Sequence, residues 1–294
     1  MLPNFICPGA QKSATTTLHD ILIQHPDIYL PQNKETHFFD KDKEYIKGVN
    51  FYKNEYYSTV KEEKIIGDIT PGYMFFEDSV KRIYNTLGDN IKIIFMLRNP
   101  IERAYSHYWM SYRRTYENQT FERAVELESD RLNKNYFNKN HFSYIERGYY
   151  ARQIKRFLEF FPKENMKFII FNEFINNKND SVKGILNFLN LNSEVHLSLD
   201  KKSNSAFLPR FRIITKILKS SPKIIKKTGK LLPDDIRKKI VNLIEISNKQ
   251  KFQKPKIKYE TRNKLINIYY EDIIELESII NKDLSFWYNL KRED

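Results

Sequence analysis

The sequence predicts an α/β protein with a P-loop-like parallel β-sheet flanked by helices, in a single domain spanning residues 1–294. Short apolar stretches alternate with amphipathic segments, and the first apolar stretch turns through a glycine into a helix. A chain of 294 residues is also long enough to bury one substantial core. The predicted strands are Phe5–Cys7, Ile28–Leu30, Ile65–Asp68, Ile91–Leu97 and Met166–Phe171.

The segments between these strands have helical patterns. Ile91–Leu97 is a continuous apolar run, typical of a parallel strand buried on both faces, so helices should cover both sides of the sheet. Residues 111–145 are helical and charged, which suggests a surface excursion. The other predicted helices are Thr15–Gln24, Phe75–Leu87, a helix after Pro100, Arg147–Phe160, Val182–Leu189 and Glu260–Ile280.

Cysteine content and hydropathy predict a cytoplasmic protein. One cysteine allows no intrachain disulfide, which favours a reducing compartment. No run of 18 or more apolar residues is present, as a membrane-spanning helix would need. The first strand begins almost at the N-terminus, leaving no room for a signal peptide.

The net charge of +13 is concentrated in one segment. Residues 201–264 contain 20 Lys and Arg against four Asp and Glu, a balance of +16, so the rest of the chain carries −3. We expect residues 205–247 to be a basic helical insertion, and 248–258 to be a loop. Amphipathic basic helices at 211–246 could form a solvated outer face, contact an anionic polymer, or contact a membrane surface.

The stretch Asn4–Leu18, NFICPGAQKSATTTL, has the composition of a phosphate-binding turn. A strand runs through Pro8-Gly9 into a helix, with Lys12 in the connection. The free amides of a helix's first turn and the helix dipole favour an anion. The Walker pattern GxxxxGK[ST] does not match, because no glycine directly precedes Lys12 and the loop is too short. An ordinary strand-to-helix turn is the alternative.

Two further clusters could carry chemistry. In KETHFFD, residues 34–40, Glu35 and His37 would project from the same face if the segment were extended, as in a general-base arrangement. A solvated loop held by two phenylalanines is the alternative. Arg98 follows the strand Ile91–Leu97, at the edge where α/β sheets bind ligands, and with Ser106 it could bind a second phosphate. A structural salt bridge is the alternative for Arg98.

Taken together, PGAQKSATTTL, KETHFFD and FMLRNPIERAYSHY resemble the PAPS-dependent sulfotransferases, especially the carbohydrate (heparan sulfate-type) group. FQKPKIKYETR and the terminal DLSFW resemble the family's closing region. The resemblance covers nearly the whole chain in order and is weakest at 111–145 and 205–247. It departs at GDITPGY, where some relatives carry a lysine and this chain has Ile69.

This resemblance implies a role for each matching residue. Lys12 would contact the 5'-phosphosulfate and its bridging oxygen, and Glu35 would take the acceptor's proton with assistance from His37. Arg98 and Ser106 would bind the 3'-phosphate, and Lys249, Lys251 and Lys254 would help to bind it. The loop residues implied in donor binding are Gly9, Ala10, Gln11, Lys12, Ser13, Ala14, Thr15 and Thr16. The acceptor would be a carbohydrate or lipid-linked glycan, and the product nucleotide adenosine 3',5'-bisphosphate.

Two other classes of function are alternatives. A P-loop-type nucleotide kinase would use ATP and Mg²⁺, but the Gly-Lys-Ser/Thr signature is missing and Arg98 stands where a Walker-B aspartate would be expected. A nucleic-acid binder could use the basic segment, but no recognised nucleic-acid motif is present, so no nucleic-acid partner is expected. No metal is expected, because the six histidines are scattered and the single cysteine has no partner.

Overall fold

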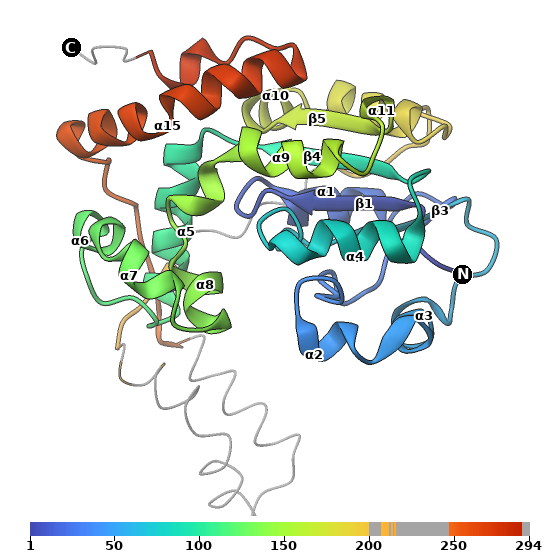
Figure 1. Ribbon diagram of the computed structural model, residues 1–294, viewed down its shortest axis with the longest axis horizontal. Helices are drawn as coiled ribbons and strands as arrows, with labels where there is room; N and C mark the ends of the chain where they lie inside the picture. The colour runs from blue at the N-terminus through green and yellow to red at the C-terminus, as the bar shows by residue number, and fades with distance from the viewer. Residues whose placement is uncertain (200–206, 212, 214, 216–246, 290–294) are drawn as a thin grey trace, which may run out of the picture. The chain divides into compact units, whose positions relative to one another are not determined.

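A computed structural model describes residues 1–199, 207–211, 213, 215 and 247–289 (Figure 1). Its five-stranded sheet is parallel throughout and has the order β2-β3-β1-β4-β5. The strands are β1 (Phe5–Gly9), β2 (Ile28–Tyr29), β3 (Ile65–Ile69), β4 (Lys92–Leu97) and β5 (Met166–Ile170). The predicted class, a parallel sheet flanked by helices, is confirmed.

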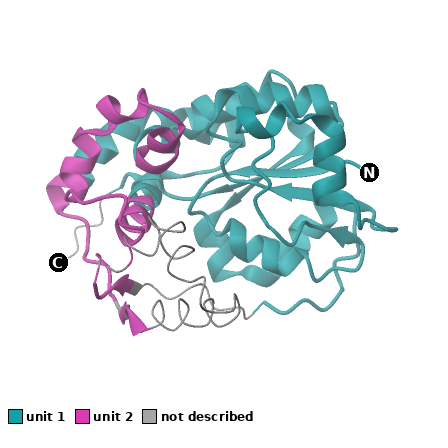
Figure 2. Cartoon of the chain, turned by 90° about the horizontal axis from the view of Figure 1, so that it is seen from below, with its two compact units in different colours: residues 1–104, 144–201, 262–294 teal, residues 105–143, 202–261 magenta. Residues whose placement is uncertain are grey.

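The described residues form two compact units (Figure 2). Unit 1 comprises residues 1–104, 144–201 and 262–294, and unit 2 comprises 105–143 and 202–261. The helices that supply unit 1 are α1 (Thr15–Leu22), α2 (Asp42–Tyr45), α3 (Gly48–Tyr57), α4 (Glu77–Leu87), the start of α5 (Pro100–Arg113), η1 (Glu146–Gly148), α9 (Tyr150–Leu158), η2 (Lys163–Asn165), α10 (Phe171–Asn176), α11 (Lys178–Phe188), most of α15 (Tyr259–Ile280) and η4 (Ser285–Trp287).

Helices pack on both faces of the sheet because its central strands are apolar on both sides. On one face Cys7 and Met96 belong to a core that includes Leu18 of α1 and Ile185 of α11. The opposite face is covered in part by α9, where the ring of Phe157 meets Phe95 edge-on with centroids 5.1 Å apart. Nearly every residue of β1, β3 and β4 is buried, as the continuous apolar runs predict.

The connections of the sheet place a crevice at the carboxyl ends of β1 and β4. From β1 the chain continues to β2 and β3 on one side of the sheet, and then crosses to β4 and β5 on the other. Neighbouring strands whose connections diverge in this way leave a ligand-binding crevice at their carboxyl ends. Strand β1 is two residues longer than predicted, and the Ala10 N–H donates to the Met96 carbonyl at 2.7 Å just beyond its end.

Unit 2 contains the rest of α5, α6 (Phe121–Glu126), α7 (Glu128–Leu132), α8 (Tyr136–Phe142) and a hairpin of β6 (Phe207–Pro209) with β7 (Lys249–Lys251). The expectation of a loop throughout 248–258 is therefore wrong for its first residues. Asn248 explains this strand, because its side chain accepts from the Phe211 N–H at 2.8 Å and donates to the Phe211 carbonyl at 3.1 Å. Most of the predicted basic insertion at 205–247 lies outside the described residues and stays a prediction.

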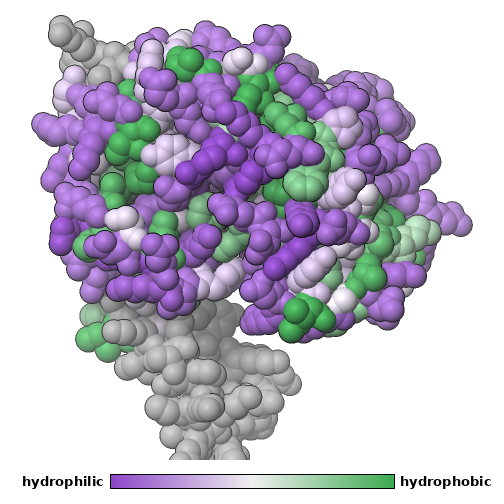
Figure 3. Space-filling view, in the orientation of Figure 1, coloured by the Kyte–Doolittle hydropathy of each residue, from purple (hydrophilic) through white to green (hydrophobic). Residues whose placement is uncertain are grey.

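The visible surface is mainly polar. On the face shown in Figure 3, hydrophilic side chains predominate and apolar ones form small separate groups. Among the described residues, no helix is both long and apolar enough to cross a bilayer.

Substitutions at two glycines can test the packing of unit 1. A Cβ at Gly148 would lie 2.6 to 2.7 Å from the buried ring of Tyr269 on α15, so we expect Gly148→Ala to destabilise the protein by about 1–3 kcal/mol. A Cβ at Gly184, inside α11, would meet only Lys167 at 3.8 Å, so Gly184→Ala should stabilise by about 0.5–1 kcal/mol. Urea unfolding measures both, and equal effects would contradict this packing.

Candidate functional site

The loop between β1 and α1 presents backbone amides at the carboxyl end of β1. Lys12 and Ala14 both have positive φ, 73° and 66°, which bends the chain sharply before α1 begins at Thr15. Ala14 is the N-cap residue and no side chain caps this helix end. The first-turn amides therefore suit an anion. Gly9 is needed for close approach, because a Cβ there would lie 2.7 Å from Met74.

Two buried polar atoms in this loop favour a ligand. Gln11 Oε1 and Ser13 Oγ are buried and have no hydrogen-bond partner of ordinary geometry among the described residues. The Ser13 hydroxyl lies beside that of Tyr150, which donates to the Arg98 carbonyl at 2.9 Å. Buried polar atoms are normally paired, so unpaired ones in an amide-rich loop fit a site that receives polar ligand atoms.

Arg98 connects the end of β4 to this loop. Its Nη1 donates a 3.2 Å hydrogen bond to the carbonyl of Lys12, and its guanidinium lies 4.5 Å from the centre of the Phe171 ring. The Arg98 side chain thus contacts the Lys12 backbone beyond the carboxyl ends of β1 and β4. Together with the loop amides, these residues fit a ligand that carries several negative charges.

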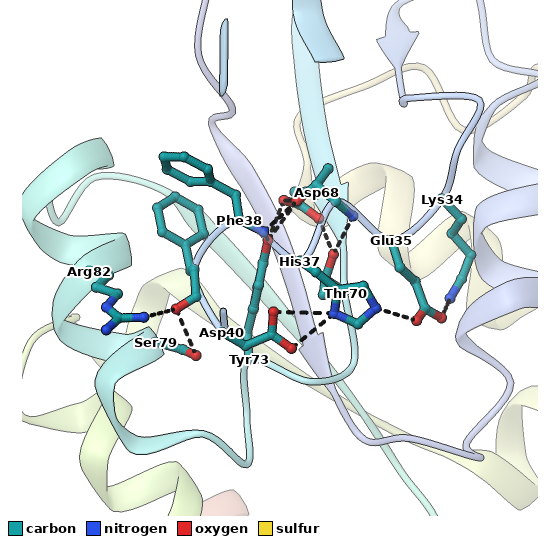
Figure 4. Close-up of polar contacts among 12 residues, drawn as sticks. Lys34, Glu35, His37, Phe38, Asp40, Asp68, Thr70, Tyr73, Ser79 and Arg82 are labelled. Carbon is teal, nitrogen blue, oxygen red and sulfur yellow. Dashed lines mark hydrogen bonds and ion pairs between the residues drawn. The ribbon is translucent and has the colours of Figure 1, made fainter. Parts of the chain in front are cut away.

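A chain of four alternating charges runs along residues 34–40 (Figure 4). Lys34 Nζ lies 2.5 Å from Glu35 Oε1, and the other carboxylate oxygen, Oε2, lies 3.4 Å from His37 Nε2. On its far side, His37 Nδ1 lies 2.9 Å from Asp40 Oδ2. The side chain of Asp40 is fully buried, whereas that of Glu35 is 41 % exposed and can reach an incoming molecule.

The condition on which the same-face argument depended, an extended segment, is not met. His37 has φ +53°, so Glu35 and His37 meet through a turn and not by strand alternation. Side-chain oxygens hold the turn: Thr70 Oγ1 accepts from the Thr36 N–H and Tyr73 Oη accepts from the Phe38 N–H, each at 3.1 Å. Glu35 and His37 lie together because of this turn.

The neighbours of each group set its charge. Burial alone would raise the pKa of Glu35, but the hydrogen bond with His37 and the charge of Lys34 outweigh it and lower that pKa to about 2. Burial alone would lower the pKa of His37, but hydrogen bonds with Asp40 and Glu35 raise it to about 9. At pH 7 the pair is therefore carboxylate and imidazolium.

The other predicted residues lie in unit 2. Ser106 is buried on α5, Lys249 and Lys251 lie in β7, and Lys254 follows that strand. Their part in ligand binding stays a prediction. Among the described residues, no group of three or more His, Cys, Asp and Glu side chains could hold a metal ion.

The sequence prediction missed two residues of this site. Asp40 orients His37, and Asp68, wholly buried at the end of β3, accepts hydrogen bonds from four hydroxyl groups. Asp40 stands inside the motif that held Glu35, and Asp68 directly follows an apolar strand. An acidic residue that ends a buried strand was the available signal for Asp68.

Known proteins share this architecture and sequence. The sequence profile of the sulfotransferase domain family matches residues 2–228. The membrane-associated sulfotransferase kil1 of Dictyostelium discoideum is 35 % identical over 137 residues, covering 44 % of this chain and 28 % of that protein. Human heparan sulfate glucosamine 3-O-sulfotransferase 5 is 27 % identical over 195 residues, covering 65 % of this chain and 54 % of that protein.

Among solved structures, a sulfotransferase from Alicyclobacillus acidocaldarius superposes with a TM-score of 0.72 at 24 % identity. The match covers 98 % of this chain and all of that one, and it shows the shared fold. The chain spans about half the length, or less, of the curated relatives named above.

The raised pKa of His37 gives a direct test. In ¹H–¹³C spectra the ring of His37 should titrate with a midpoint near pH 9, and Asp40→Asn should move the midpoint toward the ordinary value of about 6.5. Asp42→Asn, which removes a carboxylate bonded to Arg82, should leave it unchanged. Because folding raises this pKa, its contribution to stability is complete below about pH 6.5 and is lost as the pH rises through 9. A wild-type midpoint near 6.5 would contradict the assigned contacts.

Proposed function

Because this chain belongs to the sulfotransferase domain family, and is a sulfotransferase, we propose that it moves a sulfuryl group from PAPS to a hydroxyl or amine of a carbohydrate or glycolipid acceptor. The hydrogen bond from Arg98 to the Lys12 carbonyl carries the proposal, since it places the Arg98 guanidinium against the loop whose amides open α1. Relatives named for heparan sulfate glucosamine support a carbohydrate acceptor. Membership in this family favours sulfuryl transfer over the alternative of a nucleotide kinase.

The residues at the crevice suit a bisphosphorylated donor. Lys12, the amides at the start of α1 and the unpaired Gln11 and Ser13 oxygens would hold its 5'-phosphosulfate, and Arg98 would hold its 3'-phosphate. When bound, PAPS supplies an electrophilic sulfuryl group and a phosphate leaving group. Lys12 would neutralise charge that develops on the leaving group, as preorganised cations do in phosphoryl transfer.

Glu35 is proposed as the proton acceptor. Its carboxylate is ionised at every physiological pH, because its pKa is held at about 2. A carboxylate of this pKa is a weak base toward a free alcohol. An alcohol oxygen that is bonding to sulfur is far more acidic, so Glu35 can take its proton late in the transfer. His37, kept protonated by Asp40, holds the Glu35 carboxylate in place.

The two proposed roles predict different losses. Lys12→Ala should weaken binding of adenosine 3',5'-bisphosphate about tenfold to a hundredfold, as expected for a lost charged hydrogen bond, and abolish transfer. Glu35→Gln should leave that binding unchanged and lower kcat about 10²- to 10⁴-fold, the range for a general base. Calorimetry and turnover with labelled PAPS measure the two effects.

Glu44→Gln is the matched control, because Glu44 forms a similar lysine pair, with Lys47 at 2.6 Å, on the separate helix α2. A Glu35→Gln protein with wild-type turnover would remove Glu35 from the mechanism. A Lys12→Ala protein with unchanged nucleotide affinity would overturn the proposed donor site.

We also propose that the protein works in the cytoplasm and contacts the inner face of a membrane through residues 211–246. The support is the charge of +16 in residues 201–264 and the exposure of Phe211 and Ile213, which are 57 % and 74 % exposed. Basic segments with exposed apolar side chains bind anionic lipid surfaces.

Vesicles containing phosphatidylserine test this contact. At about 1 kcal/mol per lysine, replacing Lys223, Lys226 and Lys227 by Gln should weaken vesicle binding about a hundredfold. The control replaces the exposed lysines Lys43, Lys53 and Lys81, with the same change in net charge, and should leave binding near the wild-type value. Equal losses in both triple variants, or no binding by the wild type, would contradict a membrane contact at this segment.

A further inference from the structure

Asp68 is a buried carboxylate bound by hydroxyl groups. Its Oδ2 accepts from Thr36 at 2.7 Å, Tyr52 at 2.7 Å and Tyr73 at 2.9 Å, and its Oδ1 accepts from Thr70 at 2.6 Å. In the described part of the chain, no lysine, arginine or histidine forms an ion pair with it. A buried carboxylate without a cation is costly unless its hydrogen bonds are complete, so a carboxylate held this way calls for an explanation.

Three of the four hydroxyls also hold the turn that carries Glu35 and His37. Thr70 Oγ1 accepts the N–H of Thr36, and Tyr73 Oη accepts the N–H of Phe38. The third hydroxyl belongs to Thr36 itself, which lies between Glu35 and His37 in the sequence. Both amides that flank His37 are therefore held by oxygens that also contact Asp68.

The oxygens of Asp68, which accept from all four hydroxyl groups, decide the direction of these hydrogen bonds. A hydroxyl group has a single proton, and Thr70 uses its proton on Asp68, so its oxygen is left to accept from a backbone amide. Tyr73 uses its single proton on Asp68 or on Thr36 Oγ1, which lies 2.6 Å away, and in either case its oxygen accepts from the Phe38 N–H. If an asparagine replaced Asp68, its NH₂ group would donate to the hydroxyl facing it. That hydroxyl would no longer be held in the orientation in which its oxygen accepts from a backbone amide of the turn.

The turn needs such support because of its backbone. His37 has φ +53°, a left-handed conformation that costs a non-glycine residue of order 1 kcal/mol or more. That conformation aims the imidazole at Glu35 on one side and at Asp40 on the other. Without the two held amides, the turn would relax and these distances would lengthen.

We propose that Asp68 is a positioning residue for sulfuryl transfer: it orients the Thr70 and Tyr73 hydroxyls as acceptors for the amides on either side of His37, and so holds the imidazole between Glu35 and Asp40. The inference rests on the proposed function, which assigns Glu35 and His37 to the reaction. Asp68 itself touches no reacting atom.

Tyr52 supplies a matched control. Its hydroxyl donates to the same Asp68 oxygen at 2.7 Å, but its contact with the turn is ring stacking on Phe38, with centroids 4.2 Å apart. Tyr52→Phe removes an Asp68 hydrogen bond and keeps that stacking. Tyr73→Phe removes a comparable hydrogen bond and also the nearer of two acceptors for the Phe38 amide, which keeps only the 3.3 Å contact with Thr36 Oγ1. A general loss of stability would affect the two variants alike.

The test combines turnover with the titration of His37. In Tyr73→Phe and Asp68→Asn, kcat should fall about tenfold to a hundredfold, the cost of a misplacement near 1 Å. Affinity for adenosine 3',5'-bisphosphate should stay within about twofold, and the His37 midpoint should move from about 9 toward 6.5. Tyr52→Phe should keep both kcat and the midpoint. The charged groups that act on His37, namely Glu35, Asp40 and Lys41, are unchanged in all three variants.

A wild-type kcat and midpoint in Tyr73→Phe and Asp68→Asn would overturn the proposal, as would equal shifts of the midpoint in Tyr52→Phe and Tyr73→Phe. If Asp68→Asn does not fold, the pair of tyrosine variants decides. The His37 titration needs no acceptor or donor, so it still decides the positioning role if the proposed transfer activity proves wrong.

Discussion

The meeting of Arg98 with the backbone of Lys12 is the constraint on which the rest of this site depends. It exists because β1 and β4 are parallel neighbours, so that their carboxyl ends, and the side chains that follow them, lie at one edge of the sheet. The carbonyl of Lys12 and the ring of Phe171 hold the Arg98 guanidinium at this edge.

In the second cluster, residues 34–40, the charged side chains balance one another. Residues 34–40 alternate in charge, so each member stabilises the ionised form of the next. The buried end of this chain, Asp40, needs space that only glycine leaves, because a Cβ at residue 72 would lie 2.2 Å from its Oδ2. Below it, Asp68 is satisfied by hydroxyl groups alone. Charge pairing thus satisfies residues 34–40, from exposed Glu35 to buried Asp40, whereas neutral donors satisfy Asp68.

Several parts of this arrangement could be predicted from local sequence. Apolar runs located the five strands, and the glycine turn with Lys12 located the loop at the end of β1. Arg98 was found because it directly follows the clearest strand. The errors occurred where distant residues act. The turn at His37 is held by Thr70 and Tyr73, more than 30 positions away, so neighbouring residues could not predict it. The strand β7 depends in the same way on its pairing with β6.

The amino-acid order was enough to predict the α/β class and the order of elements, and to single out Lys12, Glu35, His37 and Arg98 as candidates, because strand and helix periodicity and residue chemistry are local properties. Tertiary structure was needed to show that Lys34 and Asp40 act on the charges of Glu35 and His37, and that Asp68 binds the hydroxyl groups around their turn. A pKa and a hydrogen-bond direction depend on burial and on groups brought together by folding, and neither can be read from spacing along the chain.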